Sequence, residues 1–399
     1  MIAQLGHPFA IGVLVFVVLL AGALVVGVLA ERVRIPYAVA LVAAGVAISL
    51  NRNEAPFDFG AGLLFFFLPA LLFEAAWGLS LDALRRTWRT IAWLAVPGVV
   101  VTVVIVAGVL DSFGPMVWSS AFIAGAIVSA TDPVAVIAIF RRVNIPLDLQ
   151  TIVEGESLAN DAVASVLVLG LVGFAEGAGS GSVAALAARS LVASAGGIVL
   201  GIACAYAVAL LVRGTVNLEM KTIGTVLVAY GAYILADALH LSGIFATISA
   251  GVALRALLGA TNDTADTVGT FWGVVAFLAN SLVFLLMGLT MHVERLLGEP
   301  LFVVGAIFAA LLSRVVVAYG IPPFKELRGH ARWHHVIALA GMRGGLAVAL
   351  ALSLPADIHQ RTPIVDAVFA IVLFTTLVQG LAIGPVVERL GPNGATAEA

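Results

Sequence analysis

The sequence predicts an all-α polytopic membrane protein with about thirteen transmembrane helices, and three observations support this fold class. The chain is 62% hydrophobic and 11% charged, with a mean hydropathy of +1.13, whereas soluble domains carry about a quarter charged residues. Apolar runs near twenty residues recur along its whole length, and each is long enough to cross a bilayer. Basic residues are frequent in every second connection between those runs and scarce in the connections that alternate with them.

Charges, prolines and glycine-rich breaks divide the chain into thirteen apolar segments. The first lacks a basic residue before its hydrophobic stretch, so we expect a span there and not a cleaved signal peptide. A glycine- and serine-rich stretch at 174–185 is predicted to be a flexible linker, and 389–399 a short tail. The predicted spans are 9–30, 36–50, 59–79, 91–110, 116–140, 151–172, 190–212, 221–239, 241–258, 268–290, 300–321, 334–354 and 364–387.

The distribution of basic residues tests both the count of spans and their direction. With the N-terminus outside, fourteen basic residues fall in cytoplasmic connections and four outside, which follows the positive-inside rule. We therefore expect a multi-pass protein of the cell membrane with its C-terminus in the cytoplasm. The cytoplasmic residues are Arg32, Arg34, Arg85, Arg86, Arg89, Arg141, Arg142, Arg213, Lys221, Arg255, Lys325, Arg328, Arg332 and Arg389, and the outer ones are Arg52, Arg189, Arg295 and Arg361.

Composition also excludes several classes of partner and site. The net charge of −3 and the absence of a basic patch argue against nucleic-acid binding. The single cysteine, Cys204, excludes a disulfide framework and a thiolate metal site. We expect no cofactor.

The fifth and twelfth predicted spans are each interrupted. The fifth contains Thr131, Asp132 and Pro133, and a proline removes a helical hydrogen bond and breaks the helix. A capped proline kink would also fit that motif. The twelfth contains Arg343 among glycines, where simple helix packing leaves a buried arginine unexplained. Spans 1–6 and 8–13 can form an inverted repeat, and each broken span is then the fifth span of its half. A pair of broken helices at matching positions of an inverted repeat is typical of a transporter's substrate site.

Charged and polar residues inside other spans point to a cation pathway, because such residues are costly in a membrane. On the sixth span, Glu156 and Asn160 share one helix face and Ser157 and Asp161 another. Capping explains Glu154 at the start of that span but not Asp161, about 15 Å along the helix. The third span adds Glu74, which a structural acid would also explain, and the eleventh adds Arg314.

Oxygen ligands of this kind suit small, hard cations. A carboxylate among them can hold either a proton or a sodium ion, and competition between the two is what antiport requires. The seven histidines lie in loops or at span ends, where surface positions explain them; a pH-sensing role for His334 or His335 is the alternative.

Taken in order, these motifs resemble the cation:proton antiporter superfamily, in particular its NhaP/NHE-type electroneutral sodium/proton antiporters. The matching residues are Glu74, Thr131-Asp132-Pro133, Glu156-Ser157, Asn160-Asp161, Arg314 and the glycines around Arg343. The resemblance implies a homodimer in a lipid membrane. It also implies a dimerisation part near 1–90 and 213–298, an ion-translocating core near 91–172 and 299–388, and a linker with its helix at 173–212.

The resemblance assigns roles to individual residues. Asp161 would bind the ion and the proton, assisted by Ser157, Asp132, the main chain of Thr131 and Glu74. Glu156 would pair with Arg314 and hold Asn160, while Arg343 would steady the crossing of the two broken helices. An asparagine before the aspartate resembles the electroneutral, one-for-one type.

We therefore expect a transporter that exchanges Na+ or Li+ for H+ by alternating access, and not an enzyme. Exchange of K+ for H+ on the same scaffold is the alternative within transport. An intramembrane aspartyl protease using Asp132 and Asp161 is a remote alternative, since it gives no role to Asn160 or to the two arginines. A passive channel is a further class, which proton counter-transport would exclude.

Overall fold

A computed structural model describes residues 8–33, 37–49, 60–114, 116–133, 136–137, 140, 145–175, 183–258, 262–291 and 293–390. Within these ranges every regular element is a helix, which confirms the all-α fold class. Some predictions lie outside the described residues: the charges of Arg34, Arg52, Arg141 and Arg142, the positions of His7 and His292, most of the linker 174–185, and the tail after Leu390.

Each predicted span corresponds to one helix or to helices joined across a break. Eight stretches of the described chain are long and apolar enough to cross a membrane, and four shorter apolar helices accompany them. The helices are α1 (Pro8–Val33), α2 (Tyr37–Ser49), α3 (Gly60–Gly78), α4 (Leu81–Ala95), α5 (Pro97–Phe113), α6 (Trp118–Ser129), α8 (Leu147–Ala175), α9 (Val183–Val212), α10 (Leu218–Ala238), α11 (Gly243–Leu258), α12 (Asn262–Thr290), α13 (Val293–Gly298), α14 (Pro300–Tyr319), α15 (Ala331–Ala340), α16 (Gly345–Leu352), α17 (Arg361–Phe374) and α18 (Gly380–Leu390).

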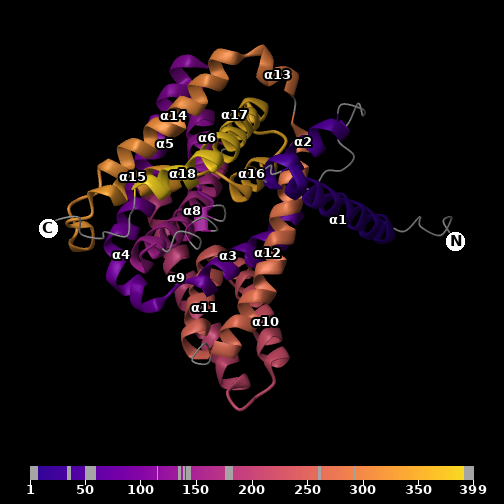
Figure 1. Cartoon of the computed structure of the whole chain (residues 1–399), viewed down its shortest axis with the longest axis vertical. Coiled ribbons are helices and arrows are strands. Elements are labelled where there is room, and N and C mark those ends of the chain that lie inside the picture. The colour runs from indigo at the N-terminus through magenta and orange to yellow at the C-terminus, as the bar shows by residue number, and fades with distance from the viewer. Residues whose placement is uncertain are drawn as a thin grey trace.

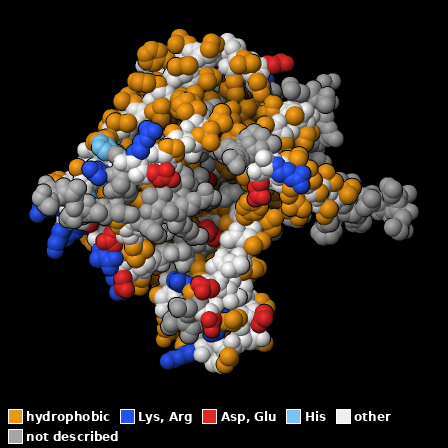
Figure 2. All heavy atoms as spheres, viewed as in Figure 1, with side chains coloured by type: hydrophobic (Ala, Val, Ile, Leu, Met, Phe, Trp, Pro, Cys, Tyr) orange, Lys and Arg blue, Asp and Glu red, His pale blue; other side chains and the backbone are white. Residues whose placement is uncertain are grey.

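The outer surface of the bundle is apolar. Figure 2 shows hydrophobic side chains over much of the face formed by α5, α14 and α17, with charged side chains gathered towards the margins. Large aliphatic residues such as Leu169, Leu191 and Leu211 are at least 70% exposed. Extended apolar exposure of this kind destabilises a protein in water but suits contact with lipid.

The helices form two groups that meet along α3, α8, α12 and α16 (Figure 1). In one group, α11 packs against α9, α10 and α3, while α12 packs along α2. In the other group, α4 packs along α8, and α5 lies between α6 and α14. Helix α17 packs against both α6 and α14. The site described below lies where the two groups meet.

Polar contacts join segments that are distant in the sequence near the ends of several helices. Arg86 at the start of α4 pairs with Asp148 of α8 at 2.5 Å. Thr90 of α4 donates to Glu326, in the connection before α15, at 2.8 Å. Ser120 of α6 donates to the carbonyl of His359, in the connection before α17, at 2.9 Å.

The predicted start of the fourth span at residue 91 is wrong, because the helix begins at Leu81. The arginines Arg85, Arg86 and Arg89 suggested a boundary, but they lie on the exposed side of α4. The opposite side is buried, including Thr87 and Leu94, and packs along α8. The chain turns at Val96, and Pro97 then begins α5, as proline suits a first helical position.

Two further differences concern helix ends. The sixth predicted span begins four residues earlier than expected, at Leu147, so Glu154 is the eighth residue of α8 and cannot cap it. The thirteenth span contains a π-helical segment at Thr375–Gln379 between α17 and α18, which the sequence analysis treated as ordinary helix. Such segments frequently accompany functional sites.

Candidate functional site

Two interrupted helices cross at the centre of the site, as predicted for spans five and twelve. Helix α6 ends at Ser129, and residues 130–133 that follow are non-helical. Helix α15 ends at Ala340, and 341–344 lead without helix into α16. The two segments are bonded to each other, because the Asp132 amide donates to the Met342 carbonyl at 2.8 Å. The Gly345 amide donates in turn to Asp132 Oδ2 at 3.4 Å.

Arg343 satisfies carbonyl groups that the break in α6 leaves without helical partners. Its Nη1 donates to the Ser129 carbonyl at 2.8 Å and to the Ala130 carbonyl at 3.3 Å, while the residue is only 3% exposed. Its own backbone amide donates to Thr375 Oγ1 in the π-helical segment at 3.2 Å. The same segment supplies Gln379, whose Nε2 donates to the Leu339 carbonyl at the end of α15, at 2.6 Å. Helix ends buried in this way require such partners.

Close approach explains the glycine at position 344. A Cβ atom built there would collide with the side chain of Asp132. A Cβ at Gly341 would likewise collide with the guanidinium of Arg314. The two breaks can approach this closely because Gly344 lacks a side chain, and the absence of one at Gly341 leaves room for Arg314 of α14.

Helix α8 holds the extended segment of the first break through a set of hydrogen bonds. Ser157 Oγ donates to the Thr131 carbonyl at 2.5 Å, and Asn160 Nδ2 donates to Thr131 Oγ1 at 2.8 Å. The Thr131 amide donates to Asp161 Oδ1 at 3.2 Å. Asp161 is thereby placed beside the break, at the fifteenth of the twenty-nine residues of α8.

Glu156 and Arg314 form a buried ion pair between α8 and α14. Arg314 Nη2 donates to Glu156 Oε2 at 2.8 Å, and its Nη1 contacts Glu156 Oε1. Both residues are at most 5% exposed. Arg314 Nε also donates to the Ile337 carbonyl of α15 at 3.0 Å, and Glu156 accepts from Asn160 at 3.3 Å. The pair therefore links α8, α14 and α15 and supports the Asn160 amide.

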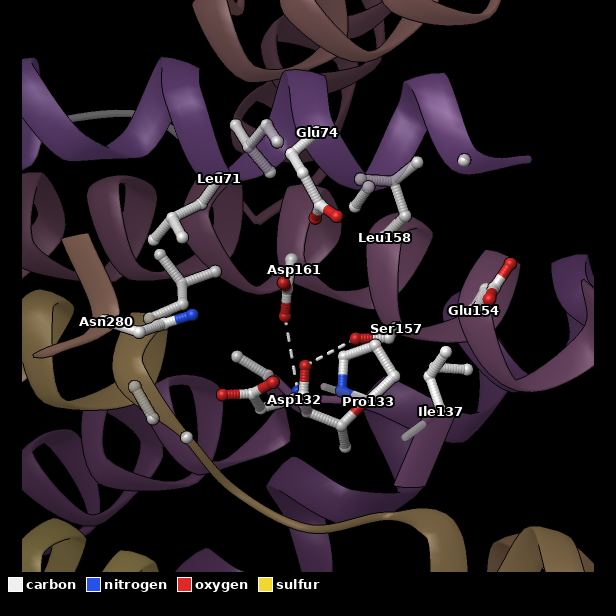
Figure 3. A pocket seen from close by; sticks show the side chains of 18 of the residues that line it. Leu71, Glu74, Asp132, Pro133, Ile137, Glu154, Ser157, Leu158, Asp161 and Asn280 are labelled. Carbon is white, nitrogen blue, oxygen red and sulfur yellow. Dashed lines mark hydrogen bonds between the residues drawn. The ribbon is translucent and has the colours of Figure 1, made fainter. Parts of the chain in front are cut away.

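A cavity of about 290 Å³ opens beside Asp161. Figure 3 shows Asp161 and Ser157 of α8, Asp132 and Pro133 of the first break and Glu74 of α3 around this space. All five residues predicted to bind an ion line it: Asp161, Asp132, Ser157, Thr131 and Glu74. The four predicted supporting residues do not line it: Asn160, Glu156, Arg314 and Arg343.

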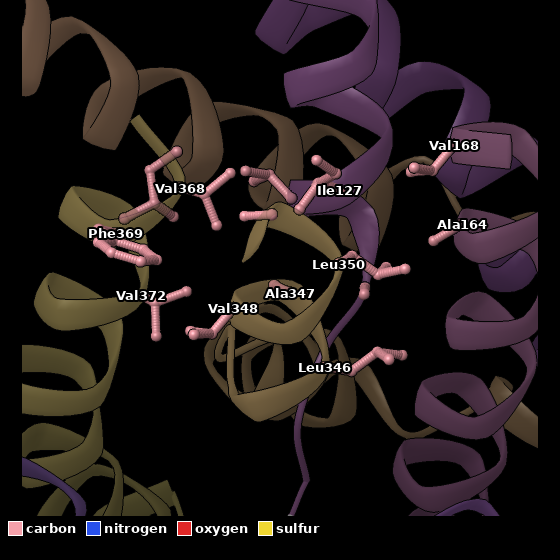
Figure 4. Packing of buried hydrophobic residues seen from close by; sticks show 14 of the residues in the cluster. Ile127, Ala164, Val168, Leu346, Ala347, Val348, Leu350, Val368, Phe369 and Val372 are labelled. Carbon is pink, nitrogen blue, oxygen red and sulfur yellow. The ribbon is translucent and has the colours of Figure 1, made fainter. Parts of the chain in front are cut away.

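The cavity lining follows α8 and α3 away from Asp161. Its lining residues on α8 run from Glu154 to Asp161, and those on α3 run to Gly78 at the end of that helix. Beyond Asp161 the opposite half of α8 packs into a hydrophobic cluster (Figure 4). The cluster joins α6, α8, α16 and α17 through Ile127, Ala164, Val168, Leu346, Ala347, Val348, Leu350, Val368, Phe369 and Val372.

Sequence reasoning missed some residues of the site and misread another. Asn280 of α12 lines the cavity, and a lone amide inside the apolar run of the tenth span was the available signal. Thr375 and Gln379 were also missed, and polar side chains in the middle of the thirteenth predicted span, 364–387, were the available signal. Glu154 was interpreted as a helix cap, whereas it lines the cavity.

Within the described residues, no three His, Cys, Asp or Glu side chains group as a metal site. The cavity instead combines carboxylate, hydroxyl and main-chain oxygen atoms.

Comparisons with known proteins show which proteins this chain is similar to. The family model described as "Sodium/hydrogen exchanger, transmembrane" matches residues 15–389. The low-affinity Na+/H+ antiporter NhaS1 of Synechocystis sp. is 35% identical over 92% of this chain and 72% of its own. The Na+/H+ antiporter NhaH of Halobacillus aidingensis is 32% identical over 96% of this chain and 99% of its own. The structure of the sodium proton antiporter MjNhaP1 from Methanocaldococcus jannaschii at pH 8 has the same fold, with a TM-score of 0.79 at 21% identity over 96% of this chain and 99% of that one.

Proposed function

Because the chain belongs to the sodium/hydrogen exchanger family, we propose that it exchanges Na+ or Li+ for H+ at the carboxylate of Asp161. One observation carries the proposal: this carboxylate lies midway along α8, beside the crossing of two broken helices, and lines a cavity together with Asp132, Ser157 and Glu74. Ionisable groups at such a depth in a membrane mark ion pathways. The cation is cargo here and not a resident metal.

The oxygen atoms around the cavity supply the proposed ligands. The carboxylates of Asp161, Asp132 and Glu74, the Ser157 hydroxyl and the main chain of Thr131 are hard donors that suit an alkali cation. A proton on Asp161 removes the negative charge that holds the cation. The two ligands therefore exclude each other, and each must leave before the other binds.

We further propose that the exchange is electroneutral. Asn160 stands beside Asp161 and is tied to Thr131 Oγ1 and to Glu156, and an amide does not titrate. Glu156 is neutralised by Arg314. Asp161 is then the carboxylate whose proton is exchanged for the cation, which gives one proton for each ion.

Alternating access is the proposed route across the membrane. The cavity lining runs from Asp161 along α8 to Glu154 and along α3 to Gly78, and the hydrophobic cluster packs around the other half of α8. With the predicted orientation, we infer that the cavity opens to the cytoplasm. The moving core would consist of α4–α8 and α14–α18, and would begin at Leu81 instead of near residue 91, because α4 packs along α8 and α5.

Helices α1–α3 and α10–α13 would form the dimerisation part of a homodimer in the cell membrane, and α9 would be the linker helix between the two parts. Helix α1 extends away from the bundle (Figure 1) and exposes Leu14, Val18 and Leu24. A second copy of the chain would cover such a stripe. Members of this family are transporters, so an intramembrane protease is set aside.

The first test is a proteoliposome assay with a pH-sensitive dye and separate pulses of sodium, lithium and potassium. We expect sodium or lithium to drive proton flux in the wild type. Asp161→Asn should abolish it, because the amide can hold neither the proton nor the cation. Asp263→Asn, which removes an exposed carboxylate at the start of α12, is the matched control and should exchange normally.

Each arm of this assay has a result that contradicts the proposal. Substantial sodium-driven flux in folded Asp161→Asn protein would refute the assignment of the site. A response to potassium that exceeds the responses to sodium and lithium would replace the proposed cargo with K+.

A further inference from the structure

Asn280 is a polar residue in an otherwise apolar stretch of α12. Its neighbours from Phe277 to Met287 are apolar apart from Ser281. Among the described residues of α12, Asn280 alone lines the cavity beside Asp161. Figure 3 shows its side chain extending into that space, with the amide nitrogen directed into the cavity. Polar groups at such a depth in a membrane are costly and face the protein interior or a cavity.

The side-chain amide of Asn280 has no hydrogen-bond partner among the described residues. Ser281, the next residue, differs: its hydroxyl donates to the Phe277 carbonyl at 2.5 Å and accepts from the Tyr37 hydroxyl at 2.8 Å. Asn280 is half-buried, so its polar atoms are partly withdrawn from water and no bond within the protein replaces that contact. Packing gives no reason for an amide at this position, whereas a ligand in the cavity does.

Gly345 places Asn280 next to Asp132. A Cβ atom built at Gly345 would lie 2.7 Å from Asn280 Oδ1, and the Gly345 amide donates to Asp132 Oδ2 at 3.4 Å. The two side-chain oxygen atoms thus lie beside the same residue, the first of α16. Helices α12 and α16 pack against each other there, so the Asn280 amide lies at the edge of the crossing.

We propose that Asn280 is a further ligand of the transported cation, which its side-chain oxygen binds together with the carboxylates of Asp161 and Asp132. The inference rests on the proposed exchange at Asp161 and adds a ligand from α12, outside the proposed moving core. A half-turn of the amide about its Cβ–Cγ bond exchanges the nitrogen and the oxygen, and so directs the oxygen into the cavity. An amide oxygen is a hard donor that suits an alkali cation. Because the amide does not titrate, it strengthens cation binding without adding a proton to the cycle.

Loss of this ligand should appear in binding and not in turnover. Leucine is close to asparagine in size and has no polar side-chain atom. In Asn280→Leu we expect the KM for sodium to rise about tenfold, since contacts between a charged group and a neutral polar group contribute at least this much to affinity. The value of kcat should stay within about twofold of wild type. Without sodium, the variant should be at least as stable as wild type, because it loses a polar group that has no hydrogen-bond partner.

The experiment measures sodium binding and transport separately. Binding is followed as the rise in unfolding temperature of detergent-purified protein with sodium concentration, at an ionic strength held constant with choline chloride, because a ligand of the folded state stabilises it. Sodium-driven proton flux in proteoliposomes gives KM and kcat. Asn280→Leu and Asn280→Ala are compared with wild type.

Ser281→Ala is the matched control, since it removes a polar group of the same helix that does not line the cavity. It should show the opposite pattern. Without sodium its unfolding temperature should fall, because the Ser281 hydroxyl is hydrogen-bonded within the protein. Its sodium dependence should match that of wild type in both measurements.

The outcomes separate this ligand from the exchange function on which it rests. Folded Asn280→Leu protein with wild-type sodium dependence, in binding and in KM, would overturn the inference and leave exchange at Asp161 standing. A loss confined to kcat, or a loss in Asn280→Ala that is absent in Asn280→Leu, would also overturn it, because the side chain would then act by filling space. Absence of sodium-driven flux in the wild type would overturn both. We expect both variants to need about tenfold more sodium than wild type for the same rise in unfolding temperature.

Discussion

At the scale of single residues, the interior charges divide into two sets. Glu156 and Arg314 neutralise each other behind the site, and Arg343 is bound by the carbonyl groups of Ser129 and Ala130. Asp161 and Asp132 face the cavity instead. A charge buried without a partner costs several kcal/mol, and the bonds of the first set avoid that cost next to the cavity.

This division predicts the result of a double-mutant cycle on the buried pair. Arg314→Ala and Glu156→Ala should each lower stability by about 3–5 kcal/mol, because each leaves a charge uncompensated inside the protein. The double variant should lose less than the sum of the two single losses. Thermal unfolding in detergent measures all four proteins, and Arg86→Ala, which breaks an exposed pair with Asp148, should change little. Additive losses would show that the pair is not coupled.

At the scale of elements, the site depends on two chain segments that leave the helical conformation and bond to each other. Asp132 and Met342 form the direct backbone contact. Arg343, Thr375 and Gln379 provide hydrogen-bond partners for the groups that the breaks expose. Because each segment supplies hydrogen-bond partners to the other, a change that displaces one segment should displace both.

A methyl group at the crossing should therefore disturb both segments together. Gly344→Ala would place a Cβ against the side chain of Asp132, so we expect lower thermal stability and exchange reduced by at least about tenfold, which corresponds to about 1.4 kcal/mol. Gly108→Ala in α5, where a Cβ meets nothing within 4 Å, is the matched control and should keep both properties. A Gly344→Ala protein with wild-type stability and flux would contradict the close approach.

The positions of helix breaks were predicted correctly where a single residue disrupts a helix by itself. Helix ends and site residues were missed where contacts with distant parts of the chain determine them. Pro133 and the glycines around Arg343 disrupt a helix by themselves, so both breaks were found. The start of α4 was missed because its arginines lie on the exposed side of a helix whose other side is buried. Asn280 and the π-helical segment were missed because their importance arises from neighbours distant in sequence, namely the cavity and Arg343.

At the scale of the whole molecule, the surroundings of Asp161 differ along α8. The cavity lining extends from Asp161 to Glu154, while the other half of the helix packs into the cluster that contains Val348 and Phe369. In the exchange proposed above, a proton and a cation would both reach the carboxylate through this cavity and would compete for it.

Competition fixes the sign of the pH dependence. As the pH falls, protons occupy more of the sites, so the apparent KM for sodium should rise, approaching about tenfold per pH unit once the site is mostly protonated. At high pH the maximal rate should fall, because the return step needs a proton. Flux is measured over a grid of pH values and sodium concentrations. At each sodium concentration, the plot of flux against pH should be bell-shaped, and the fall in flux on its acidic side should move to lower pH as the sodium concentration increases. A KM that does not change over several pH units would contradict a shared site.

The contact between Arg343 and the end of α6 has a consequence for turnover. The Ser129 and Ala130 carbonyls carry the partial negative charge of a helix C-terminus, and in transporters such ends can coordinate cations themselves. Here a guanidinium already occupies both. Arg343 thus takes the place that a cation could occupy at this helix end. In the exchange proposed above, a cation that reaches the crossing would therefore bind at Asp161 and would not be held at the end of α6.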